Sequence, residues 1–195
     1  MKDKAGNNDI FSTQSLVTMA MFAAVLCVSA YLSIPLPNGT HITLLNFVTT
    51  LIVLVFPVGQ AVLIILAWLL LGCVGVPIFA GGSAGIGYLI SPIGGYNFAF
   101  LVSAILVPLL CGRKYIRIRT TAAALFSVTL VDLMGTLQMM ILSDMTFLKA
   151  LIAGFLPFIV LDIVKAVAAA QLVPVFRQIL SNERSASASK RLKHD

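Results

Sequence analysis

Two opposite charges stand close together in an apolar stretch near the end of the chain. In "LPFIVLDIVKAV", Asp162 and Lys165 are three residues apart, so they would project from the same face of a helix. Charges in apolar segments usually face a cavity or a partner. The pair is either a clamp, in which Lys165 binds an anionic group and Asp162 accepts hydrogen bonds from ligand N–H groups, or a self-neutralising pair that serves packing. Pro157 lacks a backbone donor and could open the helix just before the pair.

Several other polar or aromatic residues could belong to the same site. Asp132, in "LVDLMGTLQMM", either lines the site or pairs with a polar group on a neighbouring helix. Gln138 is a candidate for contacting a ligand. Trp68 and Tyr96 could stack on a ligand, or belong to the core or to a membrane interface. His41 is expected to be a surface-loop histidine rather than a ligand or a proton relay.

The composition predicts that these residues lie inside a membrane protein. The chain has 195 residues, of which 59% are hydrophobic and only 10% are charged, whereas soluble domains are about 25% charged. No Asp, Glu, Lys or Arg occurs between Asp9 and Arg113. Half of the chain therefore could not form a water-exposed surface, and we predict an integral membrane protein.

Six apolar segments are long enough to be transmembrane helices, at about 20 residues per span. They cover roughly residues 14–32, 42–56, 60–72, 95–111, 120–142 and 147–176. We therefore expect an all-α fold with an N-terminal segment over 1–13, a six-helix transmembrane domain over 14–180 and a disordered basic tail over 181–195. Irregular backbone near a membrane must pack in protein or line a cavity, so the loops after the first and third spans are expected to cap an outward-facing pocket.

The basic residues predict the orientation of the chain. Eleven of the 13 Lys and Arg residues lie on the side of the two termini and of the loop 112–119, which places both termini in the cytoplasm. They form no stripe that would suit nucleic acid, so no nucleic-acid partner is expected. No P-loop, HExxH or GxSxG pattern occurs. We therefore expect no enzyme activity, no cofactor and no metal site.

Five segments in order resemble one family. "AYLSIPLP", "ITLLN", "GVPIFAGGSAGIGYLISPIGGYNFAF", "VDLMGTLQM" and "LPFIVLDIVKA" are similar to motifs of BioY proteins. BioY proteins are the biotin-binding S components of energy-coupling-factor (ECF) vitamin transporters. Each motif alone is weak, but the five together cover about residues 14–172. The resemblance implies the six-helix S-component fold, an outward-facing biotin pocket and a prokaryotic cell membrane as location.

The resemblance also implies which residues bind the substrate. Asp162 and Lys165 match the acidic and basic positions that contact biotin in the family, Ser83 matches a polar position in the glycine run, and Gly94, Gly95 and Tyr96 match its GGY. Biotin offers a ureido group, an apolar thioether ring and a carboxylate, and one helix face with Asp and Lys complements both polar ends. The predicted substrate-binding residues are Asp162, Lys165, Ser83, Gly82, Gly94, Gly95, Tyr96, Gln138, Trp68 and Thr43.

Partners follow from the same resemblance. A chain without its own ATPase motif would depend on a transmembrane coupling protein and two cytoplasmic ATPase subunits. Ala20 and Ala24 in the first span are spaced for close helix packing, either within the chain or against such a partner in the lipid bilayer.

The sequence departs from the family pattern at several positions, including Ile93, where the family has a hydroxyl residue, and Leu45, where it usually has Gln. These departures leave open a preference for another small vitamin or a biotin precursor. A membrane-embedded enzyme using Asp132 or Asp162 and a passive scaffold in a larger complex are the alternatives from other classes.

Overall fold

The computed structural model describes residues 12–36, 41–112 and 114–191, with side chains placed up to residue 182. These residues are almost wholly helical. Six main helices agree in order with the six predicted spans, and the fourth begins and ends as predicted. They are α1 (Thr13–Ser29), α2 (Leu45–Val55), α3 (Val58–Cys73), α5 (Gly95–Cys111), α6 (Arg117–Leu142) and α8 (Leu156–Arg191).

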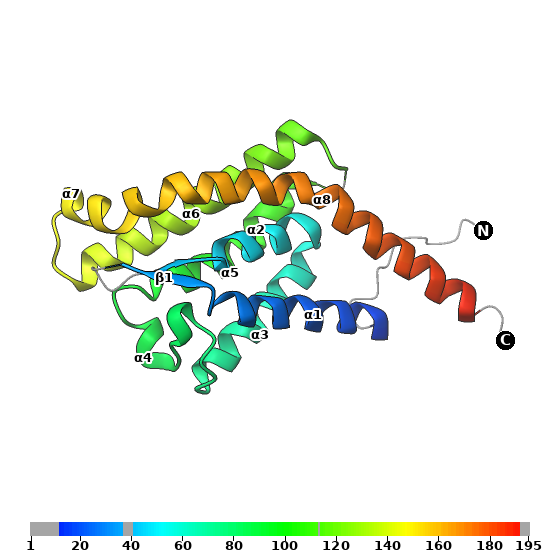
Figure 1. The fold of residues 1–195 in the computed structure, drawn as a ribbon, viewed down its shortest axis with the longest axis horizontal. Helices are drawn as coiled ribbons and strands as arrows, with labels where there is room; N and C mark the ends of the chain where they lie inside the picture. Colours follow the sequence, from blue (N-terminus) through cyan, green and yellow to red (C-terminus); the bar gives the residue numbers. More distant parts are fainter. Residues whose placement is uncertain (1–11, 37–40, 113, 192–195) are drawn as a thin grey trace.

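The helices pack as a bundle. Helix α6 lies between α5 and α8, while α2 contacts α8 and α5, and α3 contacts α5 and α1. Figure 1 shows α6 and α8 running side by side along the bundle. Small residues let α8 approach its neighbours, since Ala166, Ala169 and Ala170 are fully buried. The seam between α5 and α6 also contains a hydrogen bond of 2.7 Å between the Ser103 and Ser127 hydroxyl groups.

The irregular segments gather at one end of the bundle. Besides two short strands, they comprise η1 (Ala80–Gly82), α4 (Ile86–Leu89) and α7 (Phe147–Ala150). In Figure 1, β1, α4 and α7 lie at the end opposite to the start of α1 and the end of α8. The loops that the sequence predicts on one face therefore do share one end of the molecule.

A small antiparallel hairpin stands after α1, where the sequence predicts only irregular backbone. Strand β1 (Ser33–Pro35) pairs with β2 (His41–Thr43), with Ser33 opposite Thr43 and Pro35 opposite His41. Strands of three residues give too little alternation to be recognised in a sequence, and a proline suits such an edge strand. The hairpin positions His41 and Thr43 beside the start of α2.

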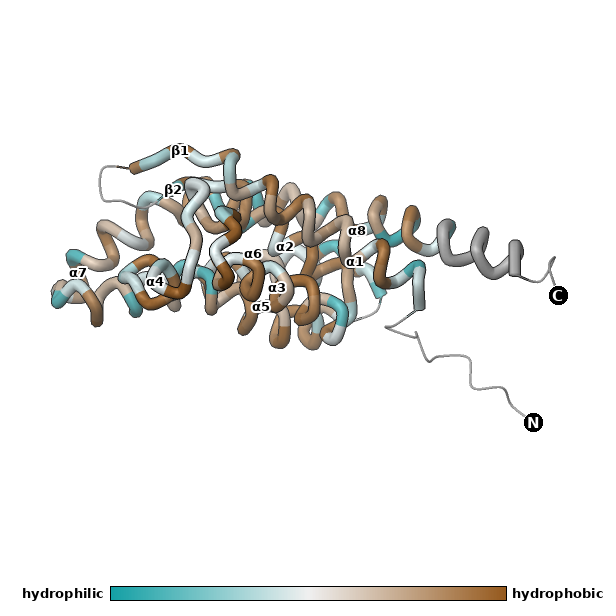
Figure 2. The backbone as a smooth tube through the Cα atoms, turned by 90° about the horizontal axis from the view of Figure 1, so that it is seen from below, coloured by the Kyte–Doolittle hydropathy of each residue, from teal (hydrophilic) through white to brown (hydrophobic). Residues whose placement is uncertain are grey.

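In the described part of the chain, two helices are long and apolar enough to cross a membrane, α6 with 26 residues and the helical run Phe147–Asn182 with 36. The other four apolar helices have 11 to 17 residues, and α2, at about 1.5 Å per residue, covers only part of a hydrocarbon layer of about 30 Å. Only 22% of the apolar stretch in the longest run is buried, and Figure 2 shows hydrophobic residues all along the helices. Apolar residues so widely exposed suit contact with lipid.

The last helical run is interrupted as the proline predicts. A π-helical turn, η2 (Leu151–Phe155), separates α7 from α8 just before Pro157. A proline ring crowds the preceding turn, and a wider turn relieves this contact. Helix α8 then continues to Arg191, into the segment for which the sequence predicts disorder. Residues 181–191 contain no Gly or Pro and are rich in Ser and Ala, which permits helix; residues 192–195 lie outside the described part.

Candidate substrate-binding site

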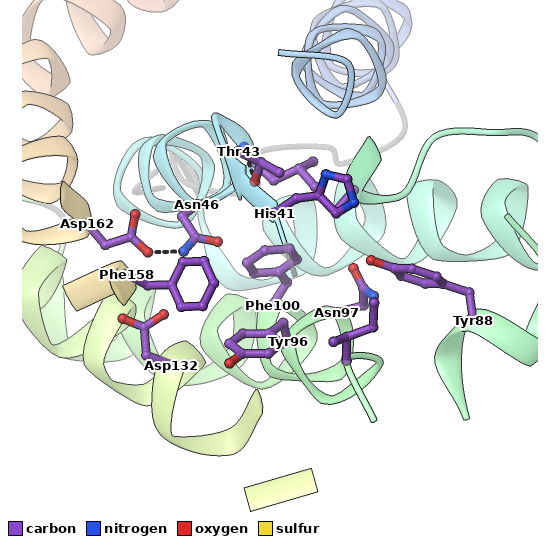
Figure 3. Close-up of a pocket in the computed structure, with 13 residues that line it drawn as sticks. His41, Thr43, Asn46, Tyr88, Tyr96, Asn97, Phe100, Asp132, Phe158 and Asp162 are labelled. Atoms are coloured by element: carbon purple, nitrogen blue, oxygen red, sulfur yellow. Dashed lines mark hydrogen bonds between the residues drawn. The ribbon is translucent and has the colours of Figure 1, made fainter. Parts of the chain in front are cut away.

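A small cavity lies where α2, α5, α6 and α8 meet the hairpin and the glycine-rich segment (Figure 3). Its volume is about 50 Å³, whereas sites for small molecules usually have about 300–1,000 Å³. A vitamin-sized ligand would therefore have to move wall side chains aside. The wall is formed by His41, Thr43, Leu45, Asn46, Ala80, Tyr88, Ile93, Tyr96, Asn97, Phe100, Asp132, Phe158 and Asp162.

Asp162 is the centre of a polar network on this wall. Its side chain is 1% exposed, and its Oδ1 accepts a hydrogen bond of 2.8 Å from Lys165 Nζ. Its Oδ2 accepts one from Asn46 Nδ2. Lys165 Nζ also donates to the carbonyl of Thr43, at 2.8 Å. The charges thus neutralise each other and fix α2 and β2 at the cavity, as the packing alternative describes. The clamp alternative, in which the pair binds a ligand, stays a prediction.

Asp132 lies on the wall as well, on α6 (Figure 3). It is completely buried, and neither of its carboxyl oxygens has a hydrogen-bond partner among the described residues. Of the two sequence-based alternatives, pairing with a neighbouring helix is therefore the one that this structure does not show. Its carboxyl group has free hydrogen-bonding capacity at the cavity.

Aromatic side chains form the apolar part of the wall. The rings of Tyr96 and Phe158 meet edge to face with centroids 6.0 Å apart, and the Tyr96 hydroxyl donates to the carbonyl of Gly154 at 2.5 Å. A Cβ atom at Gly135 would lie 2.3 Å from the Tyr96 ring, so the glycine makes room for this tyrosine. Flat apolar faces of this kind suit a small ring system.

The structure places Trp68 behind the site rather than in its wall. The indole is completely buried and donates from Nε1 to the carbonyl of Ile78 at 3.0 Å. Its ring packs against Phe79 and Phe100, with centroids 5.1 and 5.8 Å away. Of the alternatives for Trp68, a place in the core is therefore the one that the structure shows. Its ring packs against Phe100, which is a residue of the cavity wall.

Gln138, Gly94 and Gly95 also lie outside the wall, and they hold the segment before α5. Gln138 Nε2 donates to the carbonyls of Leu89 and Ser91, at 3.0 and 2.7 Å. A Cβ atom at Gly94 would lie 1.8 Å from the Leu89 carbonyl oxygen, and one at Gly95 would lie 2.7 Å from Gln138 Cβ. These residues therefore allow close packing of backbone.

Ser83 and Gly82 lie at the end of η1, and neither is part of the wall. The Ser83 carbonyl accepts a hydrogen bond of 2.9 Å from the Phe79 N–H. Gly82 has a positive φ of 75°, which glycine adopts without strain. Of the predicted substrate-binding residues, Thr43, Tyr96 and Asp162 line the cavity directly and Lys165 contacts it through Asp162.

Four polar wall residues, and apolar ones such as Phe100 and Phe158, were missed as binding candidates. Asn46 and Asn97 carry amide side chains within apolar segments. This polarity was the signal by which the sequence could have indicated them as binding residues. His41 was expected at the surface, but the hairpin turns it into the wall, and its Nδ1 has no partner among the described residues. Burial raises the pKa of Tyr88 to about 12, so its hydroxyl stays protonated at neutral pH.

The hydrogen bonds from Gln138 to the Leu89 and Ser91 carbonyls give a first prediction. Gln138→Leu should lower the stability of the purified protein by roughly 1–3 kcal/mol, because the carbonyl of buried Leu89 loses its side-chain donor and the Ser91 carbonyl keeps only the Gly94 N–H. The unfolding temperature in detergent measures this change. An unchanged unfolding temperature would show that the contacts of Gln138 with Leu89 and Ser91 do not hold this segment.

Ala20 and Ala24 lie one turn apart on α1, and both are exposed. The structure therefore leaves this face of α1 uncovered by the rest of the described chain. Its role in docking a partner stays a prediction.

The fold and the cavity define a helical membrane protein with a small cavity lined by both apolar and polar side chains. The sequence pattern of the BioY family matches residues 1–182, and the chain belongs to this family. It is 33% identical to "Biotin transporter BioY2" of Lactococcus lactis subsp. cremoris, over 83% of this chain and 87% of that protein. It is 37% identical to "Probable biotin transporter BioY" of Pyrococcus horikoshii, over 77% and 88% of the two chains.

A solved structure has the same fold. The S-component for biotin from an ECF-type ABC transporter, a crystal structure at 2.1 Å, superposes with a TM-score of 0.77. The superposition covers 89% of this chain and 95% of that chain, at 24% sequence identity. The predicted S-component fold is therefore confirmed.

Proposed function

We propose that this chain is the membrane-embedded biotin-binding subunit of an ECF transporter. The observation that carries the proposal is the network of the buried Asp162 with Lys165 and Asn46 at the cavity wall, in a chain of the BioY family. The role is binding and uptake, and no chemical conversion of the substrate is involved.

The chemistry of the wall supports biotin as the ligand. Biotin has a ureido group with two N–H donors and a carbonyl, which suits the carboxyl and amide groups from α2, α6 and α8. Its thioether ring suits the apolar faces of Tyr96, Phe100 and Phe158. Ile93 and Leu45, the two wall positions that depart from the family pattern, add further apolar surface and favour a close relative of biotin as the second candidate.

Uptake requires partners in this proposal. A transmembrane coupling protein and two cytoplasmic ATPase subunits would supply the energy, and Ala20 and Ala24 on the exposed face of α1 would contact the coupling protein. Both termini and the α5–α6 loop lie in the cytoplasm, as the distribution of Lys and Arg predicts. The cavity end then faces outward in the cell membrane.

Competition binding tests the ligand. Purified protein in detergent should bind labelled biotin saturably, and unlabelled biotin should displace it at far lower concentrations than thiamine or riboflavin. Stronger displacement by desthiobiotin than by biotin would favour the second candidate. Displacement by thiamine or riboflavin alone, or no saturable binding at all, would contradict the proposal.

A further inference from the structure

A second and larger pocket lies at the other end of the bundle from the cavity. The cavity meets the starts of α2 and α5, whereas this pocket lies where both helices end, beside the start of α3 and the later part of α8. Its volume is about 770 Å³, and sites for small molecules usually have about 300–1,000 Å³. The described residues that line it are Leu54, Val55, Phe56, Pro57, Val58, Gly59, Gln60, Pro108, Leu109, Gly112, Arg177, Leu180 and Ser181.

The wall of this pocket is mostly apolar and carries a positive charge. Among its described lining residues, Arg177 is the one charged side chain, and none is Asp or Glu. Arg177 Nη2 donates to the carbonyl of Leu54 at 2.5 Å, near the end of α2. A guanidinium group has five N–H donors in a planar fork, so it can hold this carbonyl and also contact a phosphate oxygen. A cation beside apolar side chains in a membrane protein suits the head group and the upper acyl chains of a phospholipid.

Gln60 gives the pocket an acceptor that the described chain leaves unused. Its side chain is 1% exposed, and its Nε2 donates to the Ser15 hydroxyl at 2.7 Å. Its Oε1 has no hydrogen-bond partner among the described residues. A buried amide oxygen without a donor costs free energy, and the pocket that Gln60 lines is the space from which a ligand could supply one. The fitting occupant therefore combines a phosphate with a hydrogen-bond donor.

The charges around the pocket favour an occupant with net negative charge. Lys114, Arg117 and Arg119 are exposed on the segment that follows the lining residue Gly112. Arg119 lies against this glycine, since a Cβ atom there would lie 3.3 Å from the guanidinium nitrogens. No Asp or Glu occurs in residues 45–119. A cationic head group would be repelled here, whereas basic pockets between transmembrane helices bind anionic lipid head groups.

We propose that this pocket binds an anionic phospholipid whose head group bears hydroxyl groups, as phosphatidylglycerol does. The phosphate contacts Arg177, a hydroxyl group of the head donates to Gln60 Oε1, and the acyl chains lie along the apolar side chains of the wall. The site is separate from the cavity and does not depend on what the cavity binds. A purely structural Arg177 would hold the end of α2 and respond to no lipid.

The first test needs only the wild-type chain. Native mass spectrometry in detergent measures the dissociation constants of dioleoyl phosphatidylglycerol and dioleoyl phosphatidylcholine, whose head group is cationic and lacks a donor. Phosphatidylglycerol should bind at least tenfold more tightly, and equal affinities would overturn the proposal. Inorganic phosphate should not raise the unfolding temperature. A rise equal to that with phosphatidylglycerol would assign the pocket to a free anion instead of a lipid.

Two matched arginine variants locate the site. Arg177→Gln should weaken phosphatidylglycerol binding at least fivefold and leave phosphatidylcholine binding unchanged. Arg119→Gln is the control, because Arg119 Nε also donates to a carbonyl near a helix end, that of Leu110 at 2.7 Å, but Arg119 does not line the pocket. This control should bind phosphatidylglycerol within twofold of the wild type. An equal loss in both variants would indicate general attraction to a basic surface and would overturn the site.

Gln60→Leu tests the acceptor. It should weaken phosphatidylglycerol binding at least threefold and change the affinity for dioleoyl phosphatidic acid, which lacks the glycerol of the head group, less than twofold. Equal losses for both lipids would overturn the role of Gln60. Biotin affinity should be unchanged in all three variants, since none of the three residues lines the cavity. Failure of the lipid site would therefore leave the proposed function in place.

Discussion

Asp162→Asn and Lys165→Ala are each expected to weaken biotin binding more than tenfold, or by at least about 1.4 kcal/mol. Asp162 orients the Asn46 amide, and Lys165 joins Asp162 to the Thr43 carbonyl. Removal of either charge leaves the other one without its ion partner, and the cost is greatest when the buried Asp162 is left unpaired. Equilibrium binding of labelled biotin measures the effect.

The control for this pair is Lys149→Ala. Lys149 is an exposed residue on α7, so its removal should change neither affinity nor unfolding temperature measurably. Binding at wild-type affinity in both Asp162→Asn and Lys165→Ala would remove the pair from the site.

Gly94→Ala is expected to lower the free energy of unfolding by about 3 kcal/mol or more, since overpacking against backbone finds no side chain that can move away. The added Cβ would lie 1.8 Å from the Leu89 carbonyl oxygen, so α5 and the segment before it must separate. For a chain of this size the unfolding temperature should fall by roughly 6–12 °C.

Gly87→Ala is the matched control. Gly87 lies in α4 with nothing within 4 Å of the added atom, and alanine favours helix over glycine. This variant should be as stable as the wild type or slightly more so. Equal unfolding temperatures for Gly94→Ala and Gly87→Ala would contradict the close approach described at Gly94.

The helices could be predicted from sequence because their signal is local. Apolar runs and the breaks between them indicate the six spans, and Pro157 indicates the opening before α8. The hairpin could not be predicted, because its register depends on pairing between Pro35 and His41 rather than on alternation within one strand. The continuation of α8 beyond residue 180 shows that a polar segment without Gly or Pro does not exclude helix.

The residues alone indicate the site most directly where a charge stands in an apolar helix. Asp162, Lys165 and Asp132 give that signal, and the structure brings all three to the cavity region. Gln138 gives a similar signal, but its partners are carbonyls that come near only in the folded chain. Trp68 has the residue type of a ligand-stacking side chain, and only the packing of α3 on α5 reveals it as core.

Native mass spectrometry of the purified protein tests the central claim most directly. Protein from cells grown with biotin, or incubated with biotin in detergent, should carry one biotin molecule per chain, and unlabelled biotin should exchange with an isotope-labelled form. A protein that carries no biotin under either condition, while it remains folded, would contradict the account.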